Sequence, residues 1–413
     1  MEKIAFLFSG QGSQFVGMSK NLYDNFDVAK KTFDEANDVL EFDLAKLCFE
    51  GQPSELNKTV NAQTALLVAS VATFRVFMHK VGIIPQFCAG HSLGEYSALT
   101  ASGALAFSDA LKLVRFRGEI CQRVADYDIG VMSVINGLPA EIVEKECKKM
   151  RKDDKSVWVS CLNSSHQTVV SGHEKSVLEL EGKLIELGAK IRSVFSRAPF
   201  HSLLMEETAK ELREYLDKCE FLNMRYPVVS NVTARPYTRE IPVLLEKQMT
   251  HPVRWSETIN YLESKGITSV IELGPKNVLC NLTKHNSSLI STYCYGLDED
   301  RTRFEKNFED CLYKNYKPDV VSLCIKAVVS SGNYNNDLIN FKGMFFEKFQ
   351  KLNEIKKRLN NESRKSTKEE DVFALKLVKE IFELKKVSEC EQDEWFNTIH
   401  DETATILYEI KNN

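Results

Sequence analysis

The chain has 413 residues, a formal net charge of -4 and the composition of an ordinary globular protein, long enough for two or three domains. This charge gives no reason to invoke nucleic acid or an anionic membrane as a partner, and no apolar run is long enough to span a bilayer. The eleven cysteines are scattered without a CxxC pair, which argues against a disulfide scaffold or a zinc site. We therefore expect reduced thiols in a cytoplasmic protein.

Residues 1–8 are predicted to form a buried strand. They do not suit a signal peptide, because their apolar part is too short and lacks the basic flank. A glycine-rich turn follows at residues 9–14, with a glycine spacing that fits neither a P-loop nor a dinucleotide-binding motif. It is either a simple tight turn or a ligand loop that places Gln11 at the carboxyl end of a strand, where open α/β sheets bind ligands. Helical patterns then cover Asp27–Leu40 and Ala62–Lys80.

The next segment carries a nucleophile motif. An apolar lead at residues 87–89 runs into Gly90-His91-Ser92-Leu93-Gly94, and a helix-like stretch follows, which is the G-x-S-x-G pattern in a strand–turn–helix context. The two glycines leave room for a strained turn that exposes the Ser92 hydroxyl, and the helix start directs N–H groups toward an oxyanion formed there. The alternative is a tight strand–helix turn without catalysis.

A strong helix is predicted over Ser108–Val124, with Ser108 as its N-cap. It carries Arg117, for which two interpretations stay open. The arginine either makes a structural ion pair or faces the serine, where its rigid fork could grip a carboxylate with two hydrogen bonds. The second interpretation would select an acyl group that ends in a free acid.

From about residue 130 the pattern changes to β-α-β-β-α-β, the order typical of a ferredoxin-like domain. Strands are predicted at Val131–Ile135, Val157–Leu162, Thr168–Ser171 and Lys190–Phe195, and helices at Ala140–Met150 and Lys175–Leu187. We expect this small domain to be inserted into a larger one.

The chain then returns to the large domain at Ala198-Pro199-Phe200-His201-Ser202, followed by a helix to Cys219. The remaining predicted elements are a strand at Pro227–Ser230, a helix at Ser256–Lys265 and a strand at Ser269–Leu273. His201 is the best-placed base for Ser92, although a structural histidine is the alternative, and His91 should point away from its neighbour. No acidic residue stands out as a partner for the base, and a backbone carbonyl could serve instead, because the task is to fix the Nδ1–H tautomer.

Beyond about residue 295 the composition shifts to a Lys/Glu-rich helical tail. Two amphipathic helices are marked by Phe349, Leu352, Ile355 and Leu359 and by Phe373, Leu377, Ile381 and Leu384. Thr367 and Glu370 form a capping-box pattern before the second helix, and 360–368 is predicted to be a polar linker. The charges suit solvated helix faces, and a partner-binding role is the alternative.

Taken together, these motifs resemble the malonyl-CoA:acyl carrier protein transacylases across residues 1 to about 290. The matching segments are Gly10-Gln11-Gly12-Ser13-Gln14, Gly90-His91-Ser92-Leu93-Gly94-Glu95, Arg117-Gly118, Asn163-Ser164, Val169-Val170-Ser171-Gly172, Pro199-Phe200-His201-Ser202, Ser230-Asn231-Val232-Thr233-Ala234, Gln248, Pro252-Val253-Arg254-Trp255 and Glu272-Leu273-Gly274-Pro275. The resemblance implies an α/β fold: a hydrolase-like large domain with a parallel sheet and nucleophile elbow (1–128 and 197–295), and an inserted ferredoxin-like domain (129–196). A helical C-terminal extension (296–413) completes the chain.

For the site, the resemblance implies that Ser92 is the nucleophile and His201 the base. Gln248 would orient His201 through its backbone carbonyl, giving a dyad without a carboxylate. The backbone N–H groups of Gln11 and Leu93 would form the oxyanion hole.

For selectivity, the resemblance implies that Arg117 binds the malonyl carboxylate and that Phe200 leaves no room for an α-methyl branch. Two departures from the family pattern stand out. Cys121 replaces the usual methionine one turn after the arginine, so the pocket wall could be looser, and Lys276-Asn277 replaces the usual glycine-led pair after Gly-Pro.

The function implied is ping-pong transfer of malonyl from malonyl-CoA to the phosphopantetheine thiol of an acyl carrier protein, for fatty-acid or polyketide synthesis. We expect a monomer with no permanently bound cofactor and no metal. The tail resembles helical extensions on free-standing acyltransferases of modular polyketide synthases, and we expect it to carry none of the chemistry. The alternatives are an acyl-carrier thioester hydrolase and a non-catalytic carrier-binding protein on the same scaffold.

Overall fold

A computed structural model describes residues 3–194, 197–315, 319–335, 338–362, 364 and 366–403. The chain divides into two compact units, Met1–Glu305 and Lys306–Asn413, which are described separately below. The first unit contains two sheets, and the second is helical.

The larger sheet consists of five parallel strands in the order β7-β2-β1-β8-β9. Their bounds are β1 Ile4–Phe8, β2 Phe87–Gly90, β7 Val228–Val229, β8 Ser269–Glu272 and β9 Ser291–Cys294. The central strand β1 is buried along its whole length, as its continuous apolar run predicts. Because the strands are parallel, their carboxyl ends meet at one edge, and Phe8 pairs with Gly90 there. The glycine-rich turn after β1 and the serine turn after β2 are thereby brought side by side.

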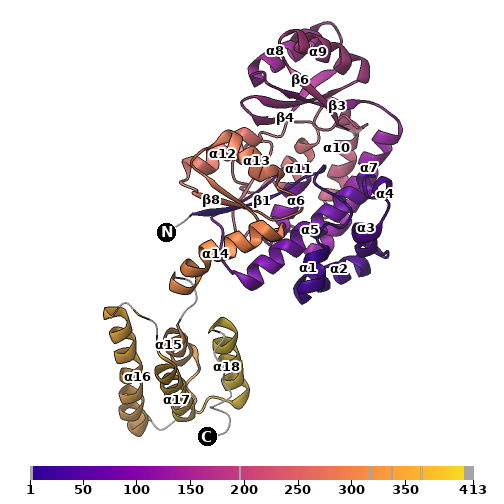
Figure 1. Ribbon diagram of the computed structural model, residues 1–413. Helices are drawn as coiled ribbons and strands as arrows, with labels where there is room; N and C mark the ends of the chain where they lie inside the picture. The colour runs from indigo at the N-terminus through magenta and orange to yellow at the C-terminus, as the bar shows by residue number, and fades with distance from the viewer. Residues whose placement is uncertain are drawn as a thin grey trace. The chain divides into compact units, whose positions relative to one another are not determined.

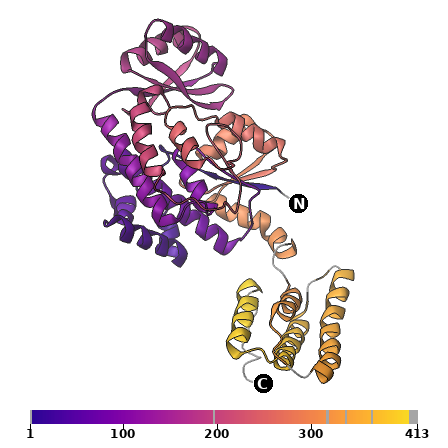
Figure 2. The same cartoon turned by 180° about the vertical axis from the view of Figure 1, so that it is seen from behind.

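Helices surround this sheet. They are α1 (Lys20–Asn25), α2 (Asp27–Leu40), α3 (Leu44–Glu50), α4 (Pro53–Leu56), α5 (Thr59–Lys80), α6 (Leu93–Ala101), α7 (Phe107–Asp126), α10 (Glu206–Leu216), α11 (Ile241–Gln248), α12 (Trp255–Ser264) and α13 (Val278–Asn286). In both views α1–α4 gather on the opposite side of the unit from α12 and α13 (Figures 1 and 2). Contrary to the expectation that no apolar run could span a bilayer, helix α5 is apolar and long enough to do so, but 78% of its most apolar window is buried among neighbouring elements. It is a core helix that packs on α7, α2 and α6.

The inserted domain has the expected element order. It comprises β3 (Val131–Asn136), α8 (Ala140–Lys152), β4 (Val157–Ser164), β5 (Gln167–Gly172), α9 (Glu174–Glu186) and β6 (Lys190–Val194). The strands form an antiparallel sheet in the order β4-β5-β3-β6. Helices α8 and α9 lie together on the side of this sheet that faces away from the larger sheet (Figure 1). A separate apolar core, which includes Val143, Val170 and Leu180, joins these helices to the strands.

One predicted helix start is wrong. Helix α7 begins at Phe107, its N-cap is Ala106, and no side chain caps it, so Ser108 lies inside the first turn. The buried ring of Phe107 explains the earlier start, because it packs under the guanidinium of Arg75 with 4.7 Å between the Arg75 Cζ and the ring centroid. Burial of that ring outweighs the capping preference of serine.

The end of the first unit also differs from the predicted boundary at residue 296. The compact unit continues to Glu305, into helix α14 (Asp298–Asn315). The reason is aromatic packing: the buried ring of Phe304 contacts Phe77 and Tyr295, with centroid distances of 5.7 and 6.1 Å. The change in composition near residue 295 therefore precedes the structural boundary.

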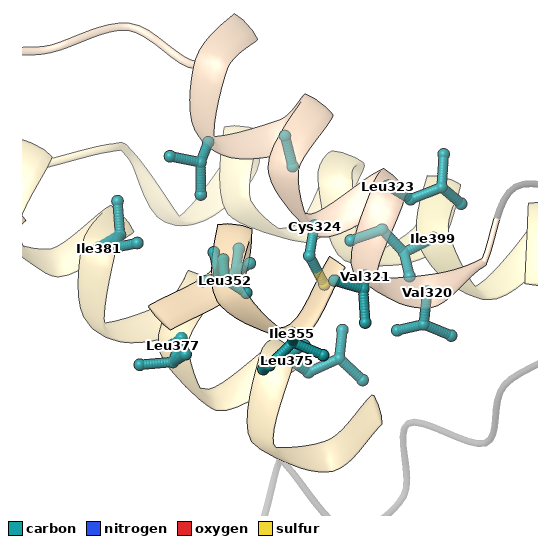
Figure 3. Close-up of a cluster of buried hydrophobic side chains, with 14 of the residues drawn as sticks. Val320, Val321, Leu323, Cys324, Leu352, Ile355, Leu375, Leu377, Ile381 and Ile399 are labelled. Carbon is teal, nitrogen blue, oxygen red and sulfur yellow. The ribbon is translucent and has the colours of Figure 1, made fainter. Parts of the chain in front are cut away.

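The second unit contains α15 (Val320–Ser330), α16 (Leu338–Asn361), α17 (Lys368–Lys385) and α18 (Glu389–Thr403). Its core consists of apolar side chains from all four helices, among them Val321, Leu352, Ile381 and Ile399 (Figure 3). The predicted capping box is confirmed, since the Thr367 side chain accepts from the N–H of Glu370 and the Glu370 carboxylate accepts from the N–H of Thr367.

Candidate active site

The serine turn is held in a strained conformation by two close backbone approaches. Ser92 lies between β2 and α6 with φ 51° and ψ −108°, a region that L-residues rarely adopt. A Cβ atom on Gly90 would lie 1.9 Å from the Gly94 carbonyl oxygen, and one on Gly94 would lie 1.9 Å from the Phe8 carbonyl oxygen. Only glycine fits at either position, so packing fixes the conformation of the serine between them.

Asn231, which follows β7, makes two hydrogen bonds to the backbone of the serine turn. Its Oδ1 accepts from the Ser92 N–H at 2.7 Å, and its Nδ2 donates to the Gly90 carbonyl at 2.6 Å. The sequence contains this residue within a family-like segment but gives no indication of its partners. The structure therefore adds a positioning residue that the sequence analysis did not identify.

Ser92, His201 and Gln248 form a hydrogen-bonded chain. Ser92 Oγ lies 2.9 Å from His201 Nε2, and His201 Nδ1 lies 2.7 Å from the Gln248 carbonyl oxygen. Because a carbonyl only accepts, Nδ1 must carry the proton, which leaves Nε2 to accept from the serine hydroxyl. Burial lowers the pKa of His201 to about 3, an effect to which the nearby Arg117 charge adds and which the hydrogen bond to Gln248 opposes. The imidazole is therefore neutral near pH 7 and available as a base.

The neighbouring histidine takes no part in this chain. His91 Nε2 lies 2.9 Å from Asn163 Oδ1 of strand β4, and its ring centroid lies 5.5 Å from that of Trp255. This agrees with the expectation that its ring points away from Ser92. The contact instead joins the turn to the inserted domain.

Arg117 on α7 lies beside the serine and is 2% exposed. Its Nη1 donates to Gln63 Oε1 at 2.7 Å, while its Nη2 donates to Gln248 Oε1 at 3.2 Å and lies 3.5 Å from Ser92 Oγ. The guanidinium also lies over the Tyr96 ring, with 5.2 Å from Cζ to the centroid. Within the described part of the chain its hydrogen-bond partners are neutral, and Nε has none.

This environment decides between the two interpretations of the arginine. No Asp or Glu of the described residues pairs with Arg117, so the structural ion pair is not observed. A buried cation without an anion is costly, and the cost is relieved when an anion binds. The site therefore holds a guanidinium suited to a carboxylate, directly beside a serine–histidine pair.

The two predicted oxyanion donors lie at adjoining strand ends. Leu93 is the first residue of α6, and Gln11 follows β1. Among the described residues, neither backbone N–H has a hydrogen-bond acceptor. The Gln11 side chain accepts from Gln63 Nε2 at 3.4 Å, which links this loop to the glutamine that holds Arg117.

Phe200 is buried immediately before His201, whose φ of 59° lies in the left-handed region. The Phe200 carbonyl accepts from Ser171 Oγ of strand β5 at 2.9 Å. The loop that carries the base is thus attached to the inserted domain. Together with the His91–Asn163 contact, this places the site where the two domains of the first unit meet.

The two departures from the family pattern are both accommodated. Cys121 is buried, and burial raises the pKa of its thiol to about 11, so it stays protonated and apolar in character. Lys276 adopts φ 61°, the left-handed conformation that suits the glycine it replaces. Its Nζ donates to the Gly12 carbonyl at 3.2 Å and so reaches the loop that carries Gln11.

Two further residues of the site were missed by sequence analysis. Gln63 is buried in the mostly apolar helix α5, which also buries Thr64, Ser70 and Thr73, so its sequence position gave no distinct signal. Glu95 closes the elbow motif and is fully buried, and burial raises its pKa to about 7 despite hydrogen bonds from Tyr237, Gln248 and Asn231. Both residues reach Arg117, Gln63 directly and Glu95 through Gln248.

Comparison with known proteins identifies the same architecture. The acyl transferase domain family matches residues 5–293. The chain is 37% identical to a malonyl CoA-acyl carrier protein transacylase of Bacillus subtilis over 396 residues, which are 95% of this chain and 99% of that protein. A malonyl CoA-acyl carrier protein transacylase of Bacillus subtilis strain 168 is 44% identical over 296 residues, 71% of this chain and 93% of that protein.

A solved complex of a type II PKS acyl-carrier protein with its malonyl-transacylase contains a chain similar in structure. The TM-score is 0.72 at 37% sequence identity, covering 74% of this chain and 99% of that one. The family match covers both sheets of the first unit and ends before the helical second unit, whereas the first relative matches through most of both. On its sequence, its fold and the geometry around Ser92, the chain belongs to the acyl transferase domain family.

Proposed function

We propose that this protein is a malonyl-CoA:acyl carrier protein transacylase that works through a malonyl ester on Ser92. The observation that carries the proposal is the buried Arg117 guanidinium, which has no acidic partner among the described residues and lies 3.5 Å from the Ser92 hydroxyl. A site with this charge favours an acyl group that ends in a carboxylate. Malonyl is such a group, with one carbon between its thioester carbonyl and its carboxylate.

In the first half-reaction, Ser92 Oγ attacks the thioester carbonyl of malonyl-CoA while its proton passes to His201 Nε2. The tetrahedral oxyanion accepts hydrogen bonds from the N–H groups of Gln11 and Leu93. When the carbon–sulfur bond breaks, the CoA thiolate takes the proton from His201. The products are CoA with a free thiol and malonyl-Ser92.

The second half-reaction reverses these roles. The phosphopantetheine thiol of the carrier protein gives its proton to His201 and attacks the ester carbonyl, and the Ser92 oxygen leaves with that proton. Throughout the cycle the Gln248 carbonyl holds His201 in the reactive tautomer. Atoms and charge balance in both halves without a metal ion or a redox cofactor, so we propose that none is required.

Two side chains would set the choice of acyl group. Arg117 pairs with the free carboxylate and penalises neutral acyl groups, which leave its buried charge unpaired. Phe200 is buried beside the base and would crowd the carbon between the two carbonyls, which disfavours a methyl branch.

The two alternative functions are less well supported. A hydrolase of carrier thioesters has no use for a buried guanidinium beside its nucleophile. A non-catalytic carrier-binding protein has no use for the 2.9 Å contact between Ser92 and His201 or for the strained serine backbone. The transferase accounts for all three features.

The setting of the reaction is part of the proposal. The carrier protein would belong to fatty-acid or polyketide synthesis, as the names of the similar proteins suggest. None of the cysteines in the described part of the chain forms a disulfide, which supports a reducing compartment such as the cytoplasm. We assign the helical second unit to partner choice or stability, because every residue of the proposed mechanism lies in the first unit.

The deciding experiment is intact mass measurement after brief exposure to malonyl-CoA, methylmalonyl-CoA or acetyl-CoA. We expect a malonyl adduct on the native protein and none on Ser92→Ala, because no other described group is placed to be the nucleophile. A malonyl adduct at full level on Ser92→Ala would disprove the assignment of the nucleophile.

A further inference from the structure

Beyond this reaction, we propose that Glu95 and the side-chain amide of Gln248 form a positioning device that aims Arg117 at the substrate carboxylate. The inference rests on the proposed malonyl transfer. It gives Gln248 a second task, separate from the contact between its backbone carbonyl and His201. Neither Glu95 nor the amide needs to touch the reacting atoms.

The two ends of the Gln248 amide meet different partners. Its Nε2 donates to Glu95 Oε2 at 2.5 Å and to the Ser92 carbonyl at 3.0 Å, while its Oε1 accepts from Arg117 Nη2 at 3.2 Å. Glu95, Arg117 and Gln248 are buried, and Ser92 is partly buried. The amide is therefore a link between the acid, the nucleophile turn and the guanidinium.

Glu95 decides which way this amide points. A carboxylate only accepts hydrogen bonds, so it requires the NH₂ end of Gln248 and leaves the oxygen end for Arg117. The reversed amide would set two donors against each other at Arg117 and two acceptors against each other at Glu95. Glu95 itself is held through its other oxygen by the Tyr237 hydroxyl and the Asn231 N–H.

The guanidinium is consequently held between two glutamines. Gln63 Oε1 accepts from Nη1, and Gln248 Oε1 accepts from Nη2. With each terminal nitrogen engaged by a neutral acceptor, the fork is fixed in one plane, and its charge is not cancelled. A misplacement of about 1 Å in such a clamp is enough to lower a rate by about a hundredfold.

The sharpest test separates the side chain of Gln248 from its backbone. Gln248→Met removes the amide and leaves the carbonyl that accepts from His201, and Glu95→Gln removes the obligate acceptor at nearly constant shape. We expect each variant to lower the malonyl-to-acetyl ratio of acylation about tenfold or more in a mixed-CoA competition at pH 8. The readout is this ratio and not the absolute rate, because loss of the Gln248 amide also removes its hydrogen bond to the Ser92 carbonyl, which acts on both substrates alike.

A double variant and a matched control complete the design. Glu95→Gln combined with Gln248→Met should be no worse in this ratio than Gln248→Met alone, because both changes remove the same link. Tyr237→Phe removes a hydrogen bond to Glu95 on the oxygen that Gln248 does not use. It should lower the melting temperature and leave the ratio near that of the native protein.

The outcomes distinguish the possible failures. A ratio unchanged in both single variants, each still forming a measurable adduct on Ser92, would overturn the positioning role. The same holds if Tyr237→Phe shifts the ratio as strongly as they do, since Glu95 would then be only a structural anchor. If Glu95→Gln does not fold, Gln248→Met decides alone. Absence of a malonyl adduct on the native protein would instead overturn the proposed function.

Discussion

The two compact units bury polar groups in very different ways. Around Ser92 the first unit buries a glutamate, an arginine, a histidine and two glutamines, each with defined partners at hydrogen-bond distance. The described core of the second unit is almost wholly apolar, with the charged Lys385 as an exception. That lysine caps the C-terminal end of α15, since its Nζ donates to the backbone carbonyls of Val328 and Ser331.

The backbone conformation around Ser92 also differs from that of the helices in the second unit. In the first unit both Ser92 and His201 have positive φ angles, and close packing of glycines and carbonyls holds the serine turn in place. In the second unit, regular helices pack by their apolar faces, and a capping box sets the start of α17. Buried polarity, which costs stability, is concentrated where the chemistry is proposed to occur. Two of the nine described residues other than glycine that have a positive φ, Ser92 and His201, also lie there. Four predictions test this contrast, from the largest expected effect to the smallest.

The largest effect is expected from loss of the base. His201→Ala should slow formation of the acyl-enzyme by about two to four orders of magnitude, because the serine then has no proton acceptor. Rapid-quench mass measurement of the Ser92 adduct gives this rate. Acylation at the native rate would mean that the base lies elsewhere.

Loss of the buried Arg117 charge should change both the rate of malonyl transfer and the preference among acyl groups. Arg117→Ala removes a charge-assisted contact of about 2–5 kcal/mol, equivalent to about 30-fold to several thousand-fold in malonyl transfer. Preference should move toward acetyl, because no buried guanidinium is then left unpaired. The measurement is the ratio of malonyl, methylmalonyl and acetyl adducts in a mixed-CoA competition.

Phe200→Ser is the matched control for Arg117→Ala. It should admit methylmalonyl while the requirement for a carboxylate persists, since the guanidinium remains in place. An Arg117→Ala protein that keeps its malonyl-over-acetyl ratio would contradict the proposed role of the arginine.

The pH dependence should show a smaller effect. The pKa of His201 is lowered to about 3, chiefly by burial, so the base stays neutral from pH 8 down to about 5. In Glu95→Gln, which lacks the carboxyl whose pKa is raised to about 7, acylation should therefore hold over this range. Stability behaves differently: below the ordinary value of 6.5 the unfolded chain binds a proton that the folded chain does not. His201 therefore lowers the free energy of unfolding as pH falls from 6.5 toward 3.

These two curves are measured separately, by single-turnover acylation and by denaturant unfolding at each pH. The rate should be taken over a range in which circular dichroism shows the protein to be folded. An acid limb near pH 6.5 in the acylation rate of folded Glu95→Gln protein, which lacks the Glu95 carboxyl that also titrates in this range, would show that His201 is solvated and not buried as described.

The smallest effect is expected from removal of the second unit. A chain ending at Glu305 should form malonyl-Ser92 within about twofold of the native rate, because the contacts of the site lie within the first unit. Transfer to a carrier protein is measured in the same preparation. A folded, truncated protein that no longer acylates would show that the second unit completes the site.

Much of this architecture could be predicted from the sequence, because it depends on local signals. Five adjacent residues predict the serine turn, and the order of strands and helices predicts the inserted domain. The spacing of Thr367 and Glu370 predicts the capping box. The partners of the proposed dyad required the family resemblance, since Gln248 lies 47 residues beyond His201 and offers only its backbone.

The missed residues act over longer separations. Asn231 lies 139 residues from Ser92, and Gln63 lies 54 residues from Arg117, so no local pattern connects either pair. The wrong helix start at Ser108 and the late boundary at Glu305 have a common cause. In both cases an aromatic side chain, Phe107 or Phe304, is buried by tertiary contacts that override the local preference.

The order of the site along the chain has a consequence for protein synthesis. Ser92 leaves the ribosome 109 residues before His201, and strand β1 gains its neighbour β8 only when residue 269 has been made. Because domains fold as units and the N-terminal part emerges first, the serine is present long before its base and its sheet are complete. A nascent chain that has not yet reached β8 is therefore expected to be inert toward CoA thioesters, and reactivity should appear only once the first unit has folded.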